Sequence, residues 1–174
     1  MTPPEFDTAR LHLRPLRQSD AGAMFSMMSD EETMLFWDWP AFRDRATVEE
    51  VVEGQIADME AGRSMYWAVL AEGVFVGCCD LSEIDEHHGR AEVGFIFARS
   101  SWGRGYAQEA MSAIVNFAFG PLGLERLWAR FHAGNDRSRV LLEGLGFIYE
   151  GCLHGHVRRD GERRDCILYG RVRG

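Results

Sequence analysis

The sequence predicts a mixed α/β fold in which a mostly antiparallel sheet of about seven strands is flanked by about four helices. Apolar and polar residues alternate in short segments of the first half of the chain, as they do in strands. Further along, an apolar segment enters a glycine-rich turn that opens an amphipathic helix, and a short helix and two strands close the chain. A length of 174 residues suits one domain over residues 1–174 with a sizeable core.

The first predicted elements are a strand and a short helix. Leu11 and Leu13 alternate with polar residues in a period-two pattern that ends at Pro15. Ser19 is expected to cap a short helix whose methionine-rich face packs into the core. The aromatic stretch over residues 34–42 has no helical or strand period, so we expect a loop there.

A longer helix and a pair of strands should follow. Thr47 and Glu50 have the spacing of a capping box, so the second helix is expected to start there and to end near Gly62. Residues 66–70 and 74–81 are expected to pair as strands across a tight turn.

The second half of the chain predicts a central strand over residues 91–97 and, after the glycine turn, a helix with an apolar stripe. Asn135 or Asp136 is expected to cap a short helix. Asp160-Gly161 signals a tight turn in a hairpin polar enough to project from the sheet. Three further strands are expected, over residues 124–131, 147–153 and 166–172.

Composition limits the classes of function. The formal net charge of −8 argues against a surface that follows nucleic-acid phosphates. No uncharged apolar stretch approaches the ~18 residues needed to cross a bilayer, and the first residues lack a basic start followed by an apolar run. We therefore expect a cytoplasmic protein with neither a membrane nor a nucleic acid as partner.

The cysteines and histidines do not predict a metal site. Cys78 and Cys79 are adjacent, and Cys152 and Cys166 fit neither a C-x-x-C nor a zinc-finger spacing. The pairs His87-His88 and His154-Gly155-His156 have no carboxylate or cysteine at a supporting spacing. We therefore expect the protein to bind no metal.

The glycine-rich turn is the most informative segment. Gly103 and Gly105 let the backbone approach an anion, and the first amides of the following helix supply donors for phosphate oxygens. A dinucleotide fingerprint is excluded because Gln108 occupies its third glycine position, and a Walker A loop is excluded because all 19 basic residues are arginine. The absence of lysine also excludes Schiff-base chemistry.

The segment Trp102-Gly103-Arg104-Gly105-Tyr106-Ala107 resembles motif A of the GNAT acyl-CoA N-acyltransferases, whose core is Gln/Arg-x-x-Gly-x-Gly/Ala. Trp102 departs from the family at the first position. The string Trp-Gly-x-Gly-Tyr-Ala, followed by Glu109-Ala110, resembles the RimJ/RimL-type branch, which acetylates protein N-termini and diverse small amines. Three other segments resemble the family, so the likeness spans nearly the whole chain: residues 8–15, 135–138 and 145–147.

The resemblance implies a GNAT-type fold and an acetyl-CoA-dependent N-acetyltransferase that acts on a primary amine, either a protein N-terminus or a small molecule. Direct transfer in a ternary complex is preferred because no cysteine occupies an obvious nucleophile position. The amine is the expected partner, and a homodimer is one assembly that the sequence allows. The alternative is a GNAT-fold module that binds CoA or regulates without turnover. An RNA-associated factor is disfavoured by the acidic charge.

Cofactor binding is assigned by the resemblance to the end of the central strand and to the turn. The backbone amides of Phe95, Ile96 and Phe97 would bind pantetheine and the acetyl oxygen, although their side chains are equally well explained as core. Arg99 and Arg104 are candidates for phosphate contacts. The complete turn set is Trp102, Gly103, Arg104, Gly105, Tyr106 and Ala107.

Glu92 is the first candidate for the base that accepts the amine proton, because Glu-Val-Gly-Phe resembles the family's Glu-Ile-Gly-Tyr. The alternative is that Glu92 only pairs with an arginine such as Arg90 or Arg126. Weaker candidates for the base are His132, His154 and Asp80. A substrate α-amino group, with a pKa near 8, would reduce the need for any base.

Ser138 is expected to protonate the leaving thiolate, and Asn135 to hydrogen-bond the pantetheine amide, because both match the family's Asn-x-x-Ser. The alternative for both is helix capping. The acceptor amine is expected to contact Phe36, Trp37 and Trp39, where cation–π attraction and the nearby acidic cluster (Asp30, Glu31, Glu32 and Asp38) suit a cation. The equal alternative is a loop that packs its aromatic rings against the protein.

Overall fold

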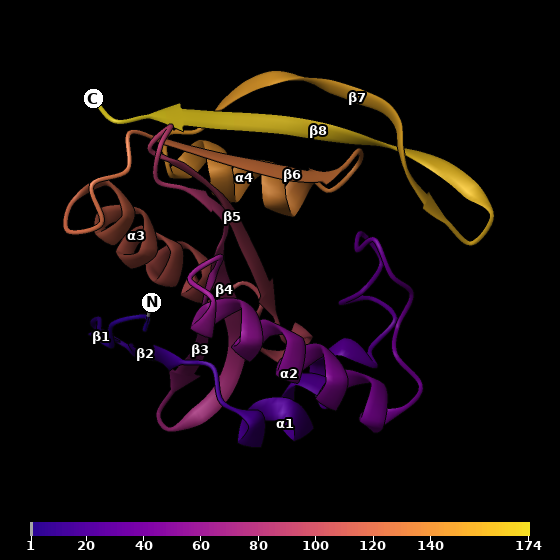
Figure 1. The fold of residues 1–174 in the computed structure, drawn as a ribbon. Coiled ribbons are helices and arrows are strands. Elements are labelled where there is room, and N and C mark those ends of the chain that lie inside the picture. Colours follow the sequence, from indigo (N-terminus) through magenta and orange to yellow (C-terminus); the bar gives the residue numbers. More distant parts are fainter. Residues whose placement is uncertain (1) are drawn as a thin grey trace.

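A computed structural model describes residues 2–174. Four helices lie on the two faces of one eight-stranded sheet (Figure 1). The strands are β1 (Phe6–Asp7), β2 (Leu11–Pro15), β3 (Met65–Ala71), β4 (Val74–Asp85), β5 (Arg90–Phe97), β6 (Arg126–His132), β7 (Ile148–Arg159) and β8 (Glu162–Val172). The helices are α1 (Ala21–Met28), α2 (Arg45–Glu60), α3 (Tyr106–Phe119) and α4 (Asp136–Gly144).

The strands lie in the order β1-β2-β3-β4-β5-β6-β8-β7, and only β5 and β6 are parallel. The expected mixed, mostly antiparallel class is therefore confirmed. The additional strand is β1, which pairs Phe6 with Leu13 and Asp7 with His12. Two residues are too short for a periodic pattern, so nothing in the local sequence marks this strand.

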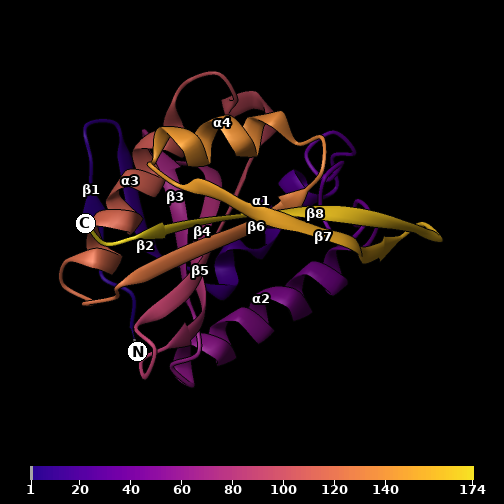
Figure 2. The same ribbon diagram turned by 90° about the horizontal axis from the view of Figure 1, so that it is seen from above.

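Side chains alternate strictly between the two faces of the sheet, as β3 illustrates. Trp67 and Val69 pack with α3, whereas Ala68 packs with α1 and α2. Figure 2 shows α4 and α2 on opposite sides of the sheet. Among the described residues, no helix is both long and apolar enough to span a membrane.

The central strands β5 and β6 separate after a short ladder. They pair only through three residues of each strand, and the last pair is Glu92 with Trp128. Strand β5 continues to Phe97 and β6 to His132, so the two strands diverge beyond this point. The divergence exposes the edge of β5 at residues 93–97 and places Glu92 where the strands begin to part.

Two expected helix starts are wrong. Helix α2 begins at Arg45, and its cap is Asp44, whose carboxylate accepts from the amides of Ala46 at 3.3 Å and Thr47 at 3.1 Å. Asp44 is extended, as a cap requires, whereas Thr47 is already helical and donates both its amide and its hydroxyl to Asp44.

Ser19 does not cap α1 either. It lies inside a 3₁₀ turn over Gln18–Asp20, and Asp20 precedes α1. The Asp20 carboxylate is held by the guanidinium of Arg14 at 2.7 Å and by the amide of Arg17 at 2.9 Å. The start of α1 is therefore fixed by a half-buried ion pair with β2, and a serine cap is not needed.

The hairpin of β7 and β8 projects from the sheet, as expected, and its tip reaches the loop between α1 and α2 (Figure 1). Its turn is Asp160-Gly161, and both residues have positive φ, of 53° and 83°. Arg159, at the tip, is buried and donates to three loop carbonyls, those of Met34, Leu35 and Trp37. This arginine holds the aromatic loop against the hairpin.

Candidate active site

The glycine turn has the backbone conformation that the sequence predicts. Gly103 and Gly105 have φ of +74° and +77°, which side-chain-bearing residues rarely adopt, and Gly105 precedes the first residue of α3. A Cβ placed on Gly103 would meet no atom within 4 Å. The amides at the start of α3 are therefore reached from open space, as an incoming anion requires.

An apolar cavity of about 500 Å³ lies beside the turn, and we call it the cofactor cavity. Its walls are the end of β5, the turn itself, the start of α4 and part of the loop before α2. Most of the predicted residues are brought together here: Phe36, Trp37, Phe95, Ile96, Phe97, Trp102, Gly103, Gly105, Tyr106, Ala107, Asn135 and Ser138.

Arg104, Trp39 and Arg99 were also predicted from the sequence, and they lie outside this cavity. The side chain of Arg104 does not line it, and the Arg104 carbonyl accepts a hydrogen bond from Arg10 at 2.8 Å. Trp39 is 67% exposed and lines none of the cavities described here, so its expected contact with the amine is not supported. Arg99 pairs with Asp30 and Glu32, each at 3.3 Å, and does not line the cofactor cavity.

Trp102, which departs from the family motif, links two walls of the cofactor cavity. Its indole N–H donates to the carbonyl of Phe97 at 2.9 Å, at the end of β5. The guanidinium of Arg137, from α4, lies 3.6 Å from the centre of the Trp102 ring. Sequence reasoning missed Arg137, although an arginine inside the Asn-x-x-Ser segment was the available signal.

Asn135 and Ser138 form the capping arrangement that the alternative interpretation expected. The Asn135 Oδ1 atom accepts from the amide of Ser138 at 3.2 Å. Both residues also line the cofactor cavity. The cap uses neither the Asn135 side-chain N–H groups nor the Ser138 hydroxyl, so capping and cofactor contact are compatible.

Glu92 lies on the face of β5 opposite to Phe95 and Phe97, toward α2, and lines a second cavity of about 690 Å³. We call this the polar cavity; its wall includes Tyr66, Ser82 and Trp128. Burial raises the pKa of Glu92 to about 7, against the opposing effect of Arg130. A carboxyl group with this pKa can both accept and release a proton near neutral pH.

The expected alternative for Glu92, a simple ion pair, is not seen. Arg90 pairs with Asp85 at 3.4 Å, and Arg126 pairs with Glu150. Within residues 2–174, Glu92 forms no ion pair. Its charged form is therefore not neutralised by a direct partner.

Asp80 lies on the same face as Glu92 and packs over Gly94, its partner across the β4–β5 ladder. A Cβ on Gly94 would lie 2.4 Å from the Asp80 Oδ1 atom, so only glycine accommodates this carboxylate. Burial raises the pKa of Asp80 to about 6. Asp80 in turn helps to raise the pKa of Glu92, since two neighbouring carboxylates resist double ionisation.

The other two candidates for the base are placed differently. His132 is 2% exposed, and its Nε2 atom lies 2.8 Å from the Asp38 Oδ1 atom. His154 is exposed on the β7–β8 hairpin. Neither histidine lines the polar cavity or the cofactor cavity.

Each carboxylate of the acidic cluster beside the aromatic loop forms an ion pair with an arginine. Asp30 and Glu32 pair with Arg99, and Glu31 pairs with Arg43. Asp38 pairs with Arg130 at 3.0 Å, and hydrogen bonds from His132 and Arg130 hold the pKa of Asp38 well below its usual range. Three arginines thus pair with four carboxylates, which weakens the expected attraction of this cluster for a cationic amine.

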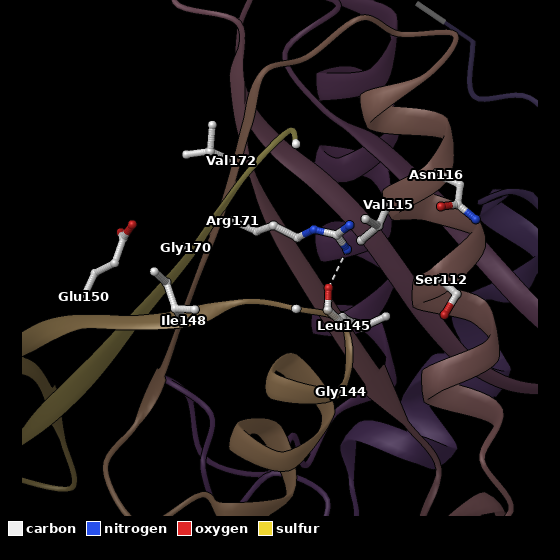
Figure 3. Close-up of a pocket in the computed structure, with 12 residues that line it drawn as sticks. Ser112, Val115, Asn116, Gly144, Leu145, Ile148, Glu150, Gly170, Arg171 and Val172 are labelled. Carbon is white, nitrogen blue, oxygen red and sulfur yellow. Dashed lines mark hydrogen bonds between the residues drawn. The ribbon is translucent and has the colours of Figure 1, made fainter.

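A third cavity of about 780 Å³ lies between α3, α4 and the β7–β8 hairpin (Figure 3). The side chain of Arg171 crosses it and donates to the carbonyl of Leu145. None of the predicted site residues lines this cavity.

Comparisons with known proteins agree with this geometry. A family model described as an acetyltransferase (GNAT) domain matches residues 10–148. The chain is 28% identical over 165 residues to the uncharacterized N-acetyltransferase p20 of Bacillus licheniformis. The aligned region covers 93% of this chain and 92% of that protein.

Two solved structures have a similar fold. One is the RimL ribosomal-protein α-N-acetyltransferase in complex with coenzyme A, with a TM-score of 0.88, 18% identity and coverage of 97% of this chain and 98% of that chain. The other is spermidine N-acetyltransferase from Vibrio cholerae in complex with CoA and spermine, with a TM-score of 0.83, 21% identity and coverage of 95% and 96%. Because the family model spans the central strands, the glycine turn and the Asn135–Ser138 segment, the chain belongs to the GNAT family of acetyltransferases.

Proposed function

We propose that this enzyme transfers an acetyl group from acetyl-CoA to a primary amine by direct transfer in a ternary complex. The observation that carries the proposal is the placement of two cavities against one strand. The cofactor cavity contacts β5 at residues 95–97, and the polar cavity contacts the same strand at Glu92. The β5–β6 divergence begins at Glu92 and exposes the edge of β5 between these two positions.

On the cofactor side, the amides at the start of α3 would bind the pyrophosphate, with Gly103 and Gly105 allowing close approach. Arg137, which carries the only positive charge among the residues that line this cavity, would add attraction to the anionic cofactor. The exposed edge of β5 would bind pantetheine through backbone groups. The Asn135 amide would donate to a pantetheine carbonyl.

Acetyl transfer then requires two proton movements. The neutral amine attacks the thioester carbonyl, a C–N bond forms, the C–S bond breaks, and the amine proton must leave. Glu92 accepts this proton. Three residues along a strand span about 10 Å, so a proton leaving the amine near Phe95 reaches Glu92 through water. The hydroxyl of Ser138 gives its proton to the departing thiolate and regains one from solvent.

The charges of the polar cavity favour a cationic amine. Asp58 and Asp85 on its wall are paired with Arg63 and Arg90, whereas Glu83 and Glu92 have no ion pair within the described chain. The rings of Tyr66 and Trp128 complete a wall that combines aromatic and anionic groups. This composition supports a small cationic amine over a bulky protein N-terminus as the acceptor.

Solved structures of similar fold support both acceptor classes, since one is a spermidine N-acetyltransferase and another a ribosomal-protein acetyltransferase. The test is thiol release from acetyl-CoA with polyamines, amino acids, aminoglycosides and peptide N-termini offered at equal concentrations. Release with one of the cationic small amines is the expected result. Acetyl-CoA binding by calorimetry without release on any amine would instead support a CoA-binding module without turnover.

Two further expectations from the sequence, a cytoplasmic location and a homodimer, stay predictions. Gel filtration with light scattering measures the second. A mass of twice 19.7 kDa would support the dimer, and a mass of 19.7 kDa would exclude it at that concentration.

A further inference from the structure

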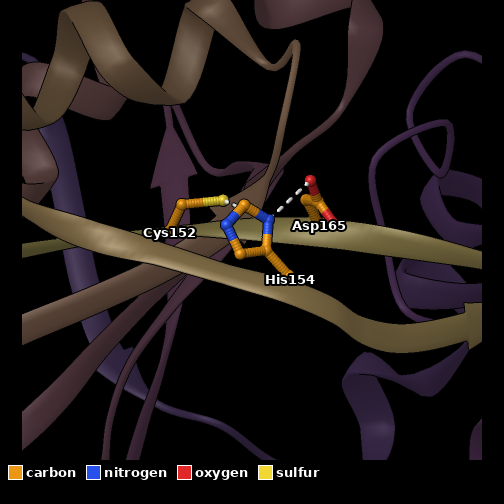
Figure 4. Close-up of side chains that lie close together, drawn as sticks. All are labelled: Cys152, His154 and Asp165. Atoms are coloured by element: carbon orange, nitrogen blue, oxygen red, sulfur yellow. Dashed lines mark hydrogen bonds and ion pairs between the residues drawn. The ribbon is translucent and has the colours of Figure 1, made fainter.

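The β7–β8 hairpin brings together three side chains that the catalytic chemistry does not use. They are Cys152 and His154 from β7 and Asp165 from β8, and Figure 4 shows the sulfur and the carboxylate on either side of the imidazole ring. The Cys152 Sγ atom lies 3.7 Å from the His154 Nδ1 atom. The same nitrogen lies 3.3 Å from the Asp165 Oδ2 atom.

Strand pairing explains why sequence spacing did not reveal this group. Leu153 pairs with Cys166 across the hairpin. Asp165 therefore lies opposite the next part of β7, where the ladder is irregular between Leu153 and Val157. Within this irregularity Gly155 has φ of +56°. The amide of Gly155 donates to the Asp165 Oδ1 atom at 2.7 Å.

The amide–carboxylate contact leaves the other Asp165 oxygen directed at His154. The bond from the Gly155 amide to Oδ1 therefore fixes the orientation of the Asp165 side chain, and Oδ2 remains available to a ligand beside His154. Metal ligands are commonly fixed in this way by hydrogen bonds to the atoms that do not bind the metal.

Two of the three separations between the ligand atoms match those of a tetrahedral zinc site. With Zn–N and Zn–O bonds near 2.1 Å and a Zn–S bond near 2.3 Å, the ligand atoms of a tetrahedron lie about 3.4 Å (N to O) and about 3.6 Å (S to N) apart. The observed separations are 3.3 Å and 3.7 Å. The three ligand atoms all lie within 4.8 Å of one another.

We propose that Cys152, His154 and Asp165 bind a zinc ion, with water at the fourth position. A thiolate and an imidazole favour zinc over magnesium or calcium, which prefer oxygen ligands. Binding releases the Cys152 thiol proton to solvent, because the thiolate is the ligand. The ion joins β7 to β8 across the irregular part of their ladder.

The site therefore has a structural consequence. The same hairpin ends at Arg159, which holds the aromatic loop through the carbonyls of Met34, Leu35 and Trp37. A metal that fixes the hairpin reduces its motion and with it the motion of this loop. Loss of the metal would lower the melting temperature and would leave the glycine turn unchanged.

The test is calorimetric titration of Zn²⁺ into the tag-free, reduced full-length protein, with Cys152→Ser and Asp165→Asn as variants. His156→Ala is the matched control, because His156 is exposed on the same strand and lies outside the group. The wild type and the control are expected to bind one equivalent, and each ligand variant to bind at least ~10-fold more weakly.

Co²⁺ supplies a second readout that does not depend on stability. A thiolate-to-cobalt charge-transfer band in the near ultraviolet is expected for wild type and His156→Ala, and its absence is expected for Cys152→Ser. The proposal is overturned if the wild type takes up no metal, if Cys152→Ser binds zinc as tightly as wild type, or if the cobalt band survives in that variant.

Discussion

The two cavities that flank β5 are built on different principles. The cofactor cavity is apolar, and its essential features are backbone conformations within two continuous segments, the turn at 102–108 and the start of α4. The polar cavity collects single charged side chains from α2, from the loop after it and from the two strands β4 and β5. Backbone amides of one short segment can bind the phosphates of a cofactor. A carboxyl group acquires a raised pKa only when it is buried, and this burial requires the assembled sheet.

The largest expected effect comes from Glu92→Gln. The variant keeps the size of the side chain and removes the base, so kcat should fall about 10²-fold or more with unchanged acetyl-CoA affinity. Thiol release at saturating substrates and calorimetry measure the two quantities.

Glu83→Gln is the matched control, since Glu83 lines the same cavity but lies farther from the exposed edge of β5. This variant should raise the KM of the amine and leave kcat nearly intact. If both variants lose kcat equally, the polar cavity acts only through its total charge, and Glu92 is not the base.

The second effect is on the leaving group. Ser138→Ala should lower kcat at least ~10-fold without weakening acetyl-CoA binding, because the thiolate needs a proton only as the C–S bond breaks. Ser112→Ala is the control, since the Ser112 hydroxyl only donates to the carbonyl of Gln108, at 2.7 Å. Equal kcat values for the two variants, with chemistry rate-limiting, would reduce Ser138 to a capping residue.

The third effect is on cofactor binding. Gly103→Val should weaken acetyl-CoA binding at least ~10-fold, about 1.4 kcal/mol, by blocking approach to the helix amides. Gly73→Val carries the same backbone strain, since the two glycines have φ of +74° and +77° and open space around each. Comparable affinities in the two folded variants would show that strain, and not the blocked approach, causes any loss.

The smallest effect concerns Arg137. Arg137 carries the positive charge of the cofactor cavity, and a partly exposed charge contact is worth about 0.5–1 kcal/mol, so Arg137→Gln should weaken acetyl-CoA binding about 2- to 5-fold. Arg139→Gln is the control, because Arg139 pairs on the outer surface with Asp136 and Glu143. Indistinguishable affinities for the two variants would remove Arg137 from the cofactor site.

The same contrast explains how much the sequence could reveal. The central strand, the turn and α3 were predictable because glycine conformation and helical period are local properties. The contact of Asp80 with Gly94 was not predictable, because it depends on the register of β4 against β5. Sequence reasoning ranked Asp80 below Glu92 and could not show that the two carboxylates share a face.

Other misses have equally specific causes. Asp44 and Thr47 are both good capping residues three positions apart, and only the extended backbone at Asp44 decides between them. The ion pairs of the acidic cluster were not predictable, because their arginines come from different parts of the chain: Arg43, Arg99 and Arg130. Pairing between distant segments leaves no periodic signal.

The pH dependence of kcat/KM tests the central claim most directly. Glu92 must be ionised to act as a base, so kcat/KM for the wild type should rise with pH through the Glu92 pKa of about 7. Deprotonation of the amine itself adds a second rise at higher pH, near 8 for an α-amino group or near 10 for an alkyl amine. In Glu92→Gln the rise near pH 7 should vanish and the second should remain. A profile in which the rise near pH 7 persists in Glu92→Gln would contradict the assignment of the base to the polar cavity.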